Sequence, residues 1–200
     1  NLQELDADIV FIKNIDNITV DNRKELTTKY KKLLLGFLIE KRQMIFDYIL
    51  KLKNDSLGDK ELAEILNFIR IEMQEEISVT FSDLSFLEQQ KYLFQKLNRP
   101  IRVCGMVKNE GEPGGGPFFA KNSKGEMSLQ IVEGSQVNMS DENQRLILSA
   151  STHFNPVDIV ASITNVEGEK FNLQNFVDEN SYIVTQKSID EKIIKALELP

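Results

Sequence analysis

The hydrophobic positions of the first hundred residues predict one short strand followed by a long helix. Asp8–Ile12 is a run of β-branched and aromatic residues between polar neighbours, which is the pattern of a buried strand. From Asp21 to Leu52 the apolar residues recur every three or four positions, as they do along one face of an amphipathic helix. Because a glycine weakens a helix interior, this segment predicts either one long helix or two helices joined near Gly36.

Two further helices are predicted before residue 100. Apolar residues at helical spacing from Leu62 to Met73 indicate the first. Ser85 and Glu88 have the spacing of a capping box, so the second helix is expected to begin there and to run to about Asn98. Its inward face is expected to carry Leu87, Phe94 and Leu97.

The second half of the chain has the pattern of strands and loops. All five prolines and eight of the ten glycines lie from Pro100 onward, and Pro100 is the expected joint because the residue before a proline is pushed out of helical geometry. The strand candidates are residues 101–107, 129–133, 145–149, 157–163 and 182–185. We therefore predict an α/β fold with a mixed sheet: a first strand within residues 1–20, a helical insertion over 21–99, and a strand-rich remainder over 100–200.

Composition excludes several classes of function. The chain carries 24 Lys and Arg against 31 Asp and Glu, a formal net charge of −7, so duplex nucleic acid is a poor partner. No apolar run approaches the roughly 18 residues of a membrane span, and no membrane partner is expected. A single cysteine, Cys104, rules out a disulfide scaffold and favours a cytoplasmic location, with Cys104 itself in the core. A histidine-based catalytic triad has only His153 available, and a zinc site of several Cys and His ligands cannot be assembled.

The most unusual segment is Lys108–Phe119, which holds three consecutive glycines between two prolines, directly after a predicted strand. Such a backbone can approach a ligand closely and can offer N–H groups to an anion. The segment is not a Walker loop, since no Gly-Lys-Ser/Thr follows, and it is not a dinucleotide fingerprint, since the chain beyond it is aromatic and then turn-like. The alternative interpretation is a flexible hairpin connection.

Three polar side chains are candidates for binding or catalysis. Asp16 follows the first predicted strand, where a carboxylate suits a hard divalent cation; a turn or a helix cap is the alternative. Glu133 closes an apolar run before a glycine, and either accepts hydrogen bonds from sugar hydroxyls in a cleft or is a solvated strand end. His153 either takes part in catalysis or orders its loop by hydrogen bonding.

Several of these segments together resemble the uncharacterised bacterial family DUF4301. The resemblance is carried by Arg102–Phe118, Ser151–Asp158 and Lys195–Pro200, and Asp8–Asn17 fits it as well. The glycine-rich run is specific, and the resemblance covers nearly all of the chain.

That family is similar, at a greater distance, to UDP-sugar pyrophosphorylases, which are nucleotidyltransferases with a GT-A-like mixed α/β fold. Lys13–Asn17 is similar to their strand ending in Val-Asp-Asn, and Ile131–Ser135 is similar to their Val-Val-Glu-Tyr-Ser. Leu148–Phe154 is similar to a segment of theirs with Asn before His-Phe, and Phe171–Asp178 to their Lys-Leu-Glu-x-Phe-x-Phe-Asp. The matches occur in the same order along the chain.

The resemblance to pyrophosphorylases implies a set of site residues. Asp16 would lie near a catalytic Mg²⁺ and a sugar phosphate, and Lys187 would meet a phosphate, so these two would be the catalytic residues. The implied substrate-binding residues are Asn17, Gly105, Gly114, Gly115, Glu133, Ser149 and His153. Among them Glu133 would hold sugar hydroxyls, and Ser149 stands where the pyrophosphorylases have a sugar-binding Asn.

The same resemblance implies that further chain is needed. Enzymes of this class bind the nucleotide with a Gly-rich, Arg- or Lys-containing loop after their first strand, and nothing before Asp8 supplies one. We therefore expect a fragment whose partner is the missing N-terminal half of the same protein.

Three functions remain open. In the first, the chain is the sugar-side part of a nucleotidyltransferase that binds a nucleotide and a sugar phosphate with Mg²⁺. Alternatively, it is a binding or regulatory module on the same fold, or a structural part that meets the N-terminal half or a second copy. An exposed apolar patch of more than a few hundred Å² on residues 21–99 would favour the structural alternative.

Overall fold

The computed structural model describes residues 2–14, 24–54, 57–112, 114–123, 125–189 and 192–198. The chain divides into two compact units. Unit 1 comprises residues 1–105 and 156–176, and unit 2 comprises residues 106–155 and 177–200. The boundaries expected at residues 20 and 99 stay a prediction.

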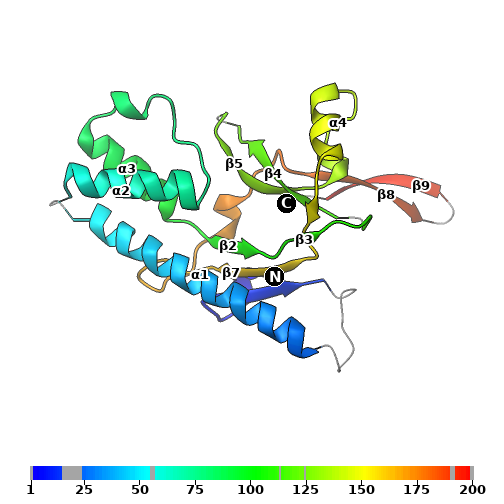
Figure 1. The fold of residues 1–200 in the computed structure, drawn as a ribbon, viewed down its shortest axis with the longest axis horizontal. Helices are drawn as coiled ribbons and strands as arrows, with labels where there is room; N and C mark the ends of the chain where they lie inside the picture. Colours follow the sequence, from blue (N-terminus) through cyan, green and yellow to red (C-terminus); the bar gives the residue numbers. More distant parts are fainter. Residues whose placement is uncertain are drawn as a thin grey trace. The chain divides into compact units, whose positions relative to one another are not determined.

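The sheet of unit 1 joins strands from distant parts of the sequence. Strand β7 (Asp158–Ser162) lies in the middle, and β1 (Ile9–Lys13) and β2 (Ile101–Cys104) pair with it on either side, both antiparallel (Figure 1). Val160 at the centre of β7 is fully buried. Three of the predicted strands are thereby confirmed.

The helices of unit 1 build its larger core. Helix α1 (Lys24–Leu52) runs unbroken through Gly36 and packs against β2 and β7 (Figure 1), so the single long helix is the correct alternative. Helix α2 (Asp59–Asn67) continues into a π-helical turn (Phe68–Glu72), and α3 (Phe86–Leu97) follows. Short 3-10 turns lie at Leu2–Glu4, Phe81–Asp83 and Leu173–Phe176. The buried cluster is Ile45, Ile49, Leu52, Leu57, Leu62, Ile65, Phe68, Ile69, Phe81, Leu93 and Leu97.

The start of α3 follows the predicted capping box, but its inward face differs from the prediction. The backbone N–H and the Oγ of Ser85 both donate to Glu88 Oε2, at 2.8 and 2.5 Å. Phe94 is half-buried against the core cluster as expected, whereas Leu87 is 74% exposed because it lies in the first turn, which the cluster does not cover. The buried side chains of the helix are Gln90, Leu93 and Leu97.

Unit 2 consists of small antiparallel sheets and one short helix. The strand pairs are β3 (Val107–Lys108) with β6 (His153–Phe154), β4 (Gly116–Lys121) with β5 (Met127–Val132), and β8 (Ile183–Ile189) with β9 (Lys192–Glu198). Between β5 and β6 the chain forms a 3-10 turn (Gly134–Gln136) and helix α4 (Glu142–Ser149). The apolar side chains described in this unit are half-buried or exposed, and the buried core lies in unit 1.

Two expectations for the strands are corrected. Residues 145–149, predicted as a strand, form the second half of α4, because the Asp141 carboxylate caps that helix by accepting the N–H groups of Asn143 and Gln144. The combination of helices and strands is confirmed. However, every strand pair in the described part of the chain is antiparallel, and the strands form four small sheets rather than one mixed sheet. None of the described helices is long and apolar enough to cross a membrane.

Candidate functional site

The glycine-rich segment leads the chain into the β4–β5 hairpin. Gly114 has a φ angle of +149°, a conformation that side-chain-bearing residues rarely adopt. Gly115 and Gly116 are buried, and Gly116 is the first residue of β4, opposite Val132 at the end of β5. The glycines therefore form a turn whose backbone packs directly against neighbouring segments.

Two of these glycines leave no room for a side chain. A Cβ on Gly115 would overlap Ile131 Cγ2 and would lie 3.3 Å from Glu133 Cγ. A Cβ on Gly116 would lie 3.1 Å from the carbonyl oxygen of His153. Glycine is therefore required here for close backbone approach.

The segment around His153 lies against the same glycines. His153 is in β6, opposite Lys108 of β3, and its Nδ1 lies within hydrogen-bond distance of Thr152 Oγ1, at 2.8 Å. Asn155, which is only 5% exposed, donates its backbone N–H to the Gly115 carbonyl oxygen at 2.8 Å. These contacts fix the imidazole-bearing segment beside the glycine turn.

Glu133 lies where β5 ends, and its side chain is half-buried. Its backbone N–H donates to Gln136 Oε1 at 2.9 Å. Gln136 Nε2 in turn donates to the Ser181 carbonyl oxygen at 3.2 Å. The Gln136 side chain therefore links the main chain at Glu133 to the main chain at Ser181.

Unit 2 thus brings together residues from three separate stretches of the chain: Gly114 and Gly115, Glu133, and His153. We call this group the glycine–glutamate site. It brings the backbone of the glycine turn next to the Glu133 side chain and the His153 carbonyl group. In general, a carboxylate side chain accepts hydrogen bonds from hydroxyls, and backbone N–H groups donate to anions.

Ser149 belongs to the same unit and ends α4. Its Oγ donates to the Leu146 carbonyl oxygen at 2.8 Å, so its hydroxyl proton is used within the helix. A Cβ on Gly134 would lie 4.0 Å from Leu148 Cδ2. The last turn of α4 therefore packs beside the turn that follows Glu133.

Gly105, Lys187, Asp16 and Asn17 are the other expected site residues. Gly105 lies in unit 1, where its N–H donates to the Asp158 carbonyl oxygen at 2.8 Å. Lys187 is in the middle of β8, in unit 2. Asp16 and Asn17 lie outside the described residues. The roles expected for these four residues stay predictions.

A metal site is likewise a prediction. Among the described residues, no group of three or more His, Cys, Asp or Glu side chains fits a metal ion. The Mg²⁺ expected from the sequence depends on Asp16, which those residues do not include.

Two residues that support the site were not singled out from the sequence. Asn155 anchors the Gly115 carbonyl through its own main chain, and only its place before a proline marks it. Gln136 stands three residues after Glu133, which is the spacing of a capping box. This spacing was the signal in the sequence from which the contact could have been predicted.

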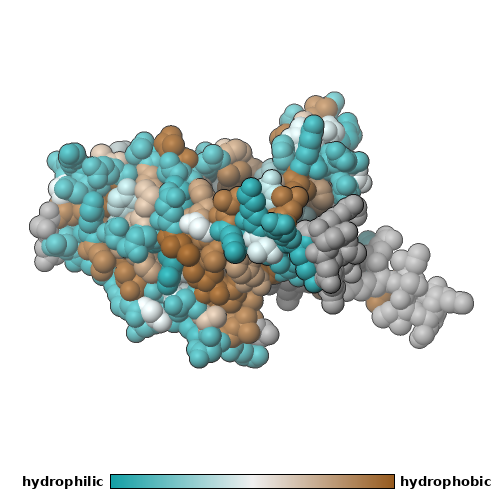
Figure 2. Space-filling view, turned by 60° about the horizontal axis from the view of Figure 1, so that its bottom comes forward, coloured by the Kyte–Doolittle hydropathy of each residue, from teal (hydrophilic) through white to brown (hydrophobic). Residues whose placement is uncertain are grey.

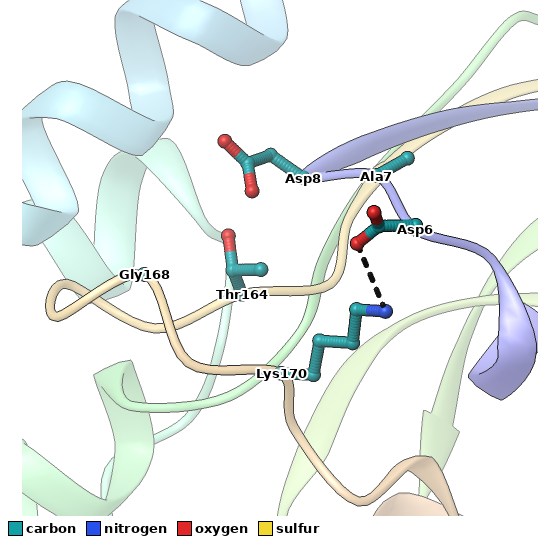
Figure 3. A pocket seen from close by; sticks show the side chains of 6 residues that line it. All are labelled: Asp6, Ala7, Asp8, Thr164, Gly168 and Lys170. Atoms are coloured by element: carbon teal, nitrogen blue, oxygen red, sulfur yellow. Dashed lines mark ion pairs between the residues drawn. The ribbon is translucent and has the colours of Figure 1, made fainter.

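Unit 1 holds a separate, open pocket of about 330 Å³. It is lined by Asp6, Ala7, Asp8, Thr164, Gly168 and Lys170 (Figure 3). Lys170 Nζ lies 3.5 Å from Asp6 Oδ1, and Figure 3 shows the Asp8 carboxylate on the Thr164 side of the pocket. Thr164 Oγ1 accepts a hydrogen bond from Arg42 Nη2 at 3.0 Å. None of these six residues is a site candidate from the sequence.

The fold and the site define an α/β protein with a glycine turn packed against a glutamate side chain at the end of a strand. The chain belongs to the family described as "Domain of unknown function (DUF4301)", which matches residues 1–200. No curated protein and no solved structure matches the chain. The expected resemblance to this family is confirmed, and the similarity to pyrophosphorylases remains a proposal.

Proposed function

We propose that unit 2 binds a sugar phosphate at the glycine–glutamate site, and that the chain is the sugar-binding part of a nucleotidyltransferase-like protein with a GT-A-like fold. The support comes from the contacts within unit 2 and from the ordered sequence similarities to sugar-nucleotide pyrophosphorylases.

The observation that carries the proposal is the approach of Gly115 to Glu133. A Cβ on Gly115 would lie 3.3 Å from Glu133 Cγ, so the backbone of the glycine turn and the Glu133 side chain lie close together. Peptide N–H groups donate to phosphate oxygens, and a carboxylate accepts from hydroxyls. A sugar phosphate carries both kinds of group on one small molecule.

The proposed roles follow from this chemistry. Glu133 accepts hydrogen bonds from sugar hydroxyls, and the backbone of Gly114 and Gly115 approaches the phosphate. His153 and Ser149 contact the sugar from the neighbouring segment. Gly105 and Asn17 complete the substrate-binding set by similarity alone.

The reaction proposed for the whole protein is nucleotidyl transfer. An oxygen of the sugar 1-phosphate attacks the α-phosphorus of a nucleoside triphosphate; the new P–O bond forms while the bond to the β-phosphate breaks, and pyrophosphate leaves. Asp16 would hold Mg²⁺, which when bound neutralises phosphate charge, and Lys187 would neutralise a phosphate directly.

The first test is calorimetric titration of the chain with glucose, galactose and N-acetylglucosamine 1-phosphates, with and without Mg²⁺. We expect at least one ligand to bind. Glu133→Gln should weaken that binding about tenfold, because it removes charge-assisted hydrogen bonds. Glu142→Gln, which changes an exposed carboxylate on α4 of the same unit, should leave it unchanged.

The second test separates binding from catalysis. Pyrophosphate release is measured for the full-length protein, with each ligand, nucleoside triphosphates and Mg²⁺. Binding without release supports the binding or regulatory module instead of the enzyme. Absence of binding to every sugar phosphate, or equal loss in both variants, contradicts the proposal.

A further inference from the structure

The open pocket of unit 1 has a lining that identifies a ligand by its chemistry. It holds two carboxylates, one ammonium group and one hydroxyl group, which come from Asp6, Asp8, Lys170 and Thr164 (Figure 3). Figure 2 shows a band of hydrophobic residues on another part of the surface, but nothing in the described part of the chain shows what covers that band. The pocket, rather than the band, therefore carries information about a binding partner.

The main chain holds both walls of the pocket in place. One wall leads into β1, and its Asp8 carbonyl oxygen accepts the N–H of Ile163 at 3.0 Å. The other wall is a turn whose first and last residues, Thr164 and Lys170, lie opposite each other in an antiparallel bridge. Gly168, at a φ of +81°, lies in the turn between them. Because the walls are already fixed, a ligand that enters the pocket has to order little of the chain.

Asp8 brings to the pocket a carboxylate that the described fold does not use. Its side chain takes part in no hydrogen bond or ion pair among the residues that the structure describes. The neighbouring acidic side chains do have partners: Asp6 Oδ1 lies 3.5 Å from Lys170 Nζ, and Glu167 of the turn is paired with Lys53. A carboxylate in this situation can accept the hydrogen bonds of an ammonium group, and charge strengthens those bonds.

Thr164 and Lys170 supply the opposite kind of group, a donor. Thr164 Oγ1 accepts a hydrogen bond from Arg42 Nη2 at 3.0 Å, so the hydroxyl proton of Thr164 is directed away from Arg42 and can be donated. The Lys170 ammonium is held by Asp6 at the outer edge of the pocket, where the Asp6 side chain is fully exposed. Ion pairs at such exposed positions are weak, so the Lys170 ammonium can also meet an anionic group of a ligand.

The charges around the pocket select a ligand that carries both signs. Asp6 and Asp8 are negative, whereas Lys170 and the Arg42 guanidinium behind Thr164 are positive. A ligand with a single charge is attracted by one sign and repelled by the other, but a zwitterion can turn each of its charges toward the opposite one. The volume of about 330 Å³ is at the lower end of the range for small-molecule sites. Ala7 is the apolar side chain in the lining, which suits a ligand with a short side chain.

We propose that this pocket binds a small free amino acid. The ammonium group of the ligand donates to the Asp8 carboxylate. Its carboxylate accepts from the Lys170 ammonium and from the Thr164 hydroxyl, whose side chain Figure 3 shows between those of Asp8 and Lys170. This site is independent of the sugar-phosphate site of unit 2, with which it shares no residue.

The test titrates the ¹⁵N-labelled full chain with L-alanine and L-serine and follows the amide signals by nuclear magnetic resonance. Two further ligands each lack one charge: N-acetyl-L-alanine has no ammonium group, and L-alaninamide has no carboxylate. We expect L-alanine or L-serine to bind and to shift the amide signals of Asp8, Thr164 and Lys170. Each of the two singly charged ligands should bind at least about tenfold more weakly, because each loses charge-assisted hydrogen bonds.

Two pairs of variants assign the contacts. Asp8→Asn should raise the Kd for L-alanine about tenfold or more, and Asp83→Asn, which changes an exposed carboxylate of unit 1 outside the pocket, should leave it unchanged. Lys170→Met should weaken the binding of L-alanine but not that of L-alaninamide, because the amide has no carboxylate to lose. Lys60→Met, on the exposed side of α2, is its control. Circular dichroism and urea unfolding confirm that the variants stay folded.

Three results overturn the proposal: no binding of L-alanine or L-serine, signal shifts confined to residues outside the pocket, or equal effects of a pocket variant and its control. The singly charged ligands decide between a zwitterion and simpler ligands. L-Alaninamide that binds as tightly as L-alanine assigns the pocket to an amine. N-Acetyl-L-alanine that binds as tightly assigns it to a carboxylic acid. Either result contradicts the amino-acid site.

Discussion

Gly115 lies so close to Glu133 that a methyl group on its Cα would come within 3.3 Å of the Glu133 Cγ. The same methyl would overlap Ile131 Cγ2 on the paired strand. We therefore expect Gly115→Ala to push β4 away from β5 and to lower the free energy of unfolding by about 1–3 kcal/mol, as overpacking does. Urea unfolding followed by far-ultraviolet circular dichroism measures the change.

The control for this prediction is Gly134→Ala in the same unit. A Cβ there would have Leu148 Cδ2 as its nearest neighbour, at 4.0 Å, an ordinary contact distance. We expect this variant to stay within about 0.5 kcal/mol of the wild type. If both variants unfold at the same urea concentration, the close packing of Gly115 has no energetic consequence and the prediction is wrong.

Gly36 offers a stabilising substitution. It lies inside α1, and no atom lies within 4 Å of the position that its Cβ would take. Gly36→Ala should raise the free energy of unfolding by about 0.5–1 kcal/mol, because alanine loses less backbone entropy in a helix. Gly125→Ala is the contrast: its surroundings are equally open, but its φ of +80° should make alanine destabilising. A destabilised Gly36→Ala would contradict the unbroken helix.

The helices of unit 1 could be predicted because their signals are local. The Ser85–Glu88 capping box lies within one turn and marks the start of α3 correctly. The exposure of Leu87 could not be predicted, because it depends on how far the core cluster reaches along the helix. The apolar run at residues 145–149 has no period that distinguishes a strand from a helix, and the cap at Asp141 decides the outcome.

The candidate site could be predicted in its parts but not in its contacts. The glycine segment and Glu133 stand out in the sequence by their composition and position. Their approach depends on the register of β4 with β5, and β4 was not among the predicted strands because its first residues, Gly116 and Pro117, favour a loop. The anchoring of Gly115 by Asn155 is a main-chain contact, which side-chain identity does not reveal.

The stability of α3 should depend on pH through Glu88. Hydrogen bonds from the Ser85 hydroxyl and from the Ser85 backbone N–H hold the pKa of Glu88 below its ordinary value of 4.5. A carboxyl group with a lowered pKa in the folded state stabilises the fold above its unfolded pKa, and this contribution is lost as the pH falls through the folded pKa. Ser85→Ala should therefore destabilise the chain near neutral pH and have less effect in acid.

Urea unfolding at about pH 7 and about pH 3 compares Ser85→Ala with Ser82→Ala, which changes an exposed serine of the preceding turn. A nuclear magnetic resonance titration of the Glu88 carboxyl should show its pKa rising in Ser85→Ala and unchanged in Ser82→Ala. A Glu88 pKa that does not respond to loss of the Ser85 hydroxyl would contradict the capping contact.

Cys104 should react slowly with thiol reagents. Burial raises the pKa of the Cys104 thiol above its ordinary value of 9.0, although Arg102 acts in the opposite direction. Because the thiolate is the reactive form, labelling with Ellman's reagent should be much slower for the folded chain than for the chain in urea, and its rate should still rise with pH above 9. The raised pKa also means that this group's contribution to stability is present below its unfolded pKa and declines as the pH rises through the folded one. Equal labelling rates in the folded and unfolded states would contradict the burial of the thiol.

Ser162 and Thr164, at the end of β7, are both buried, but their hydroxyl groups are in different situations. Thr164 Oγ1 accepts a hydrogen bond from Arg42 Nη2 at 3.0 Å, whereas Ser162 Oγ has no hydrogen-bond partner among the residues that the structure describes. A buried polar group without a partner costs about 1–3 kcal/mol of stability, so Ser162→Ala should raise the free energy of unfolding by about 1 kcal/mol.

Thr164→Val should have the opposite effect. Valine keeps the shape of threonine but cannot accept the hydrogen bond, so the Arg42 guanidinium loses a partner and the free energy of unfolding should fall by about 1–3 kcal/mol. Urea unfolding of the two variants measures the change that each substitution makes in the free energy of unfolding. We expect the two changes to have opposite signs. If Ser162→Ala destabilises the chain as much as Thr164→Val does, the Ser162 hydroxyl is satisfied in solution and the contrast between the two residues is wrong.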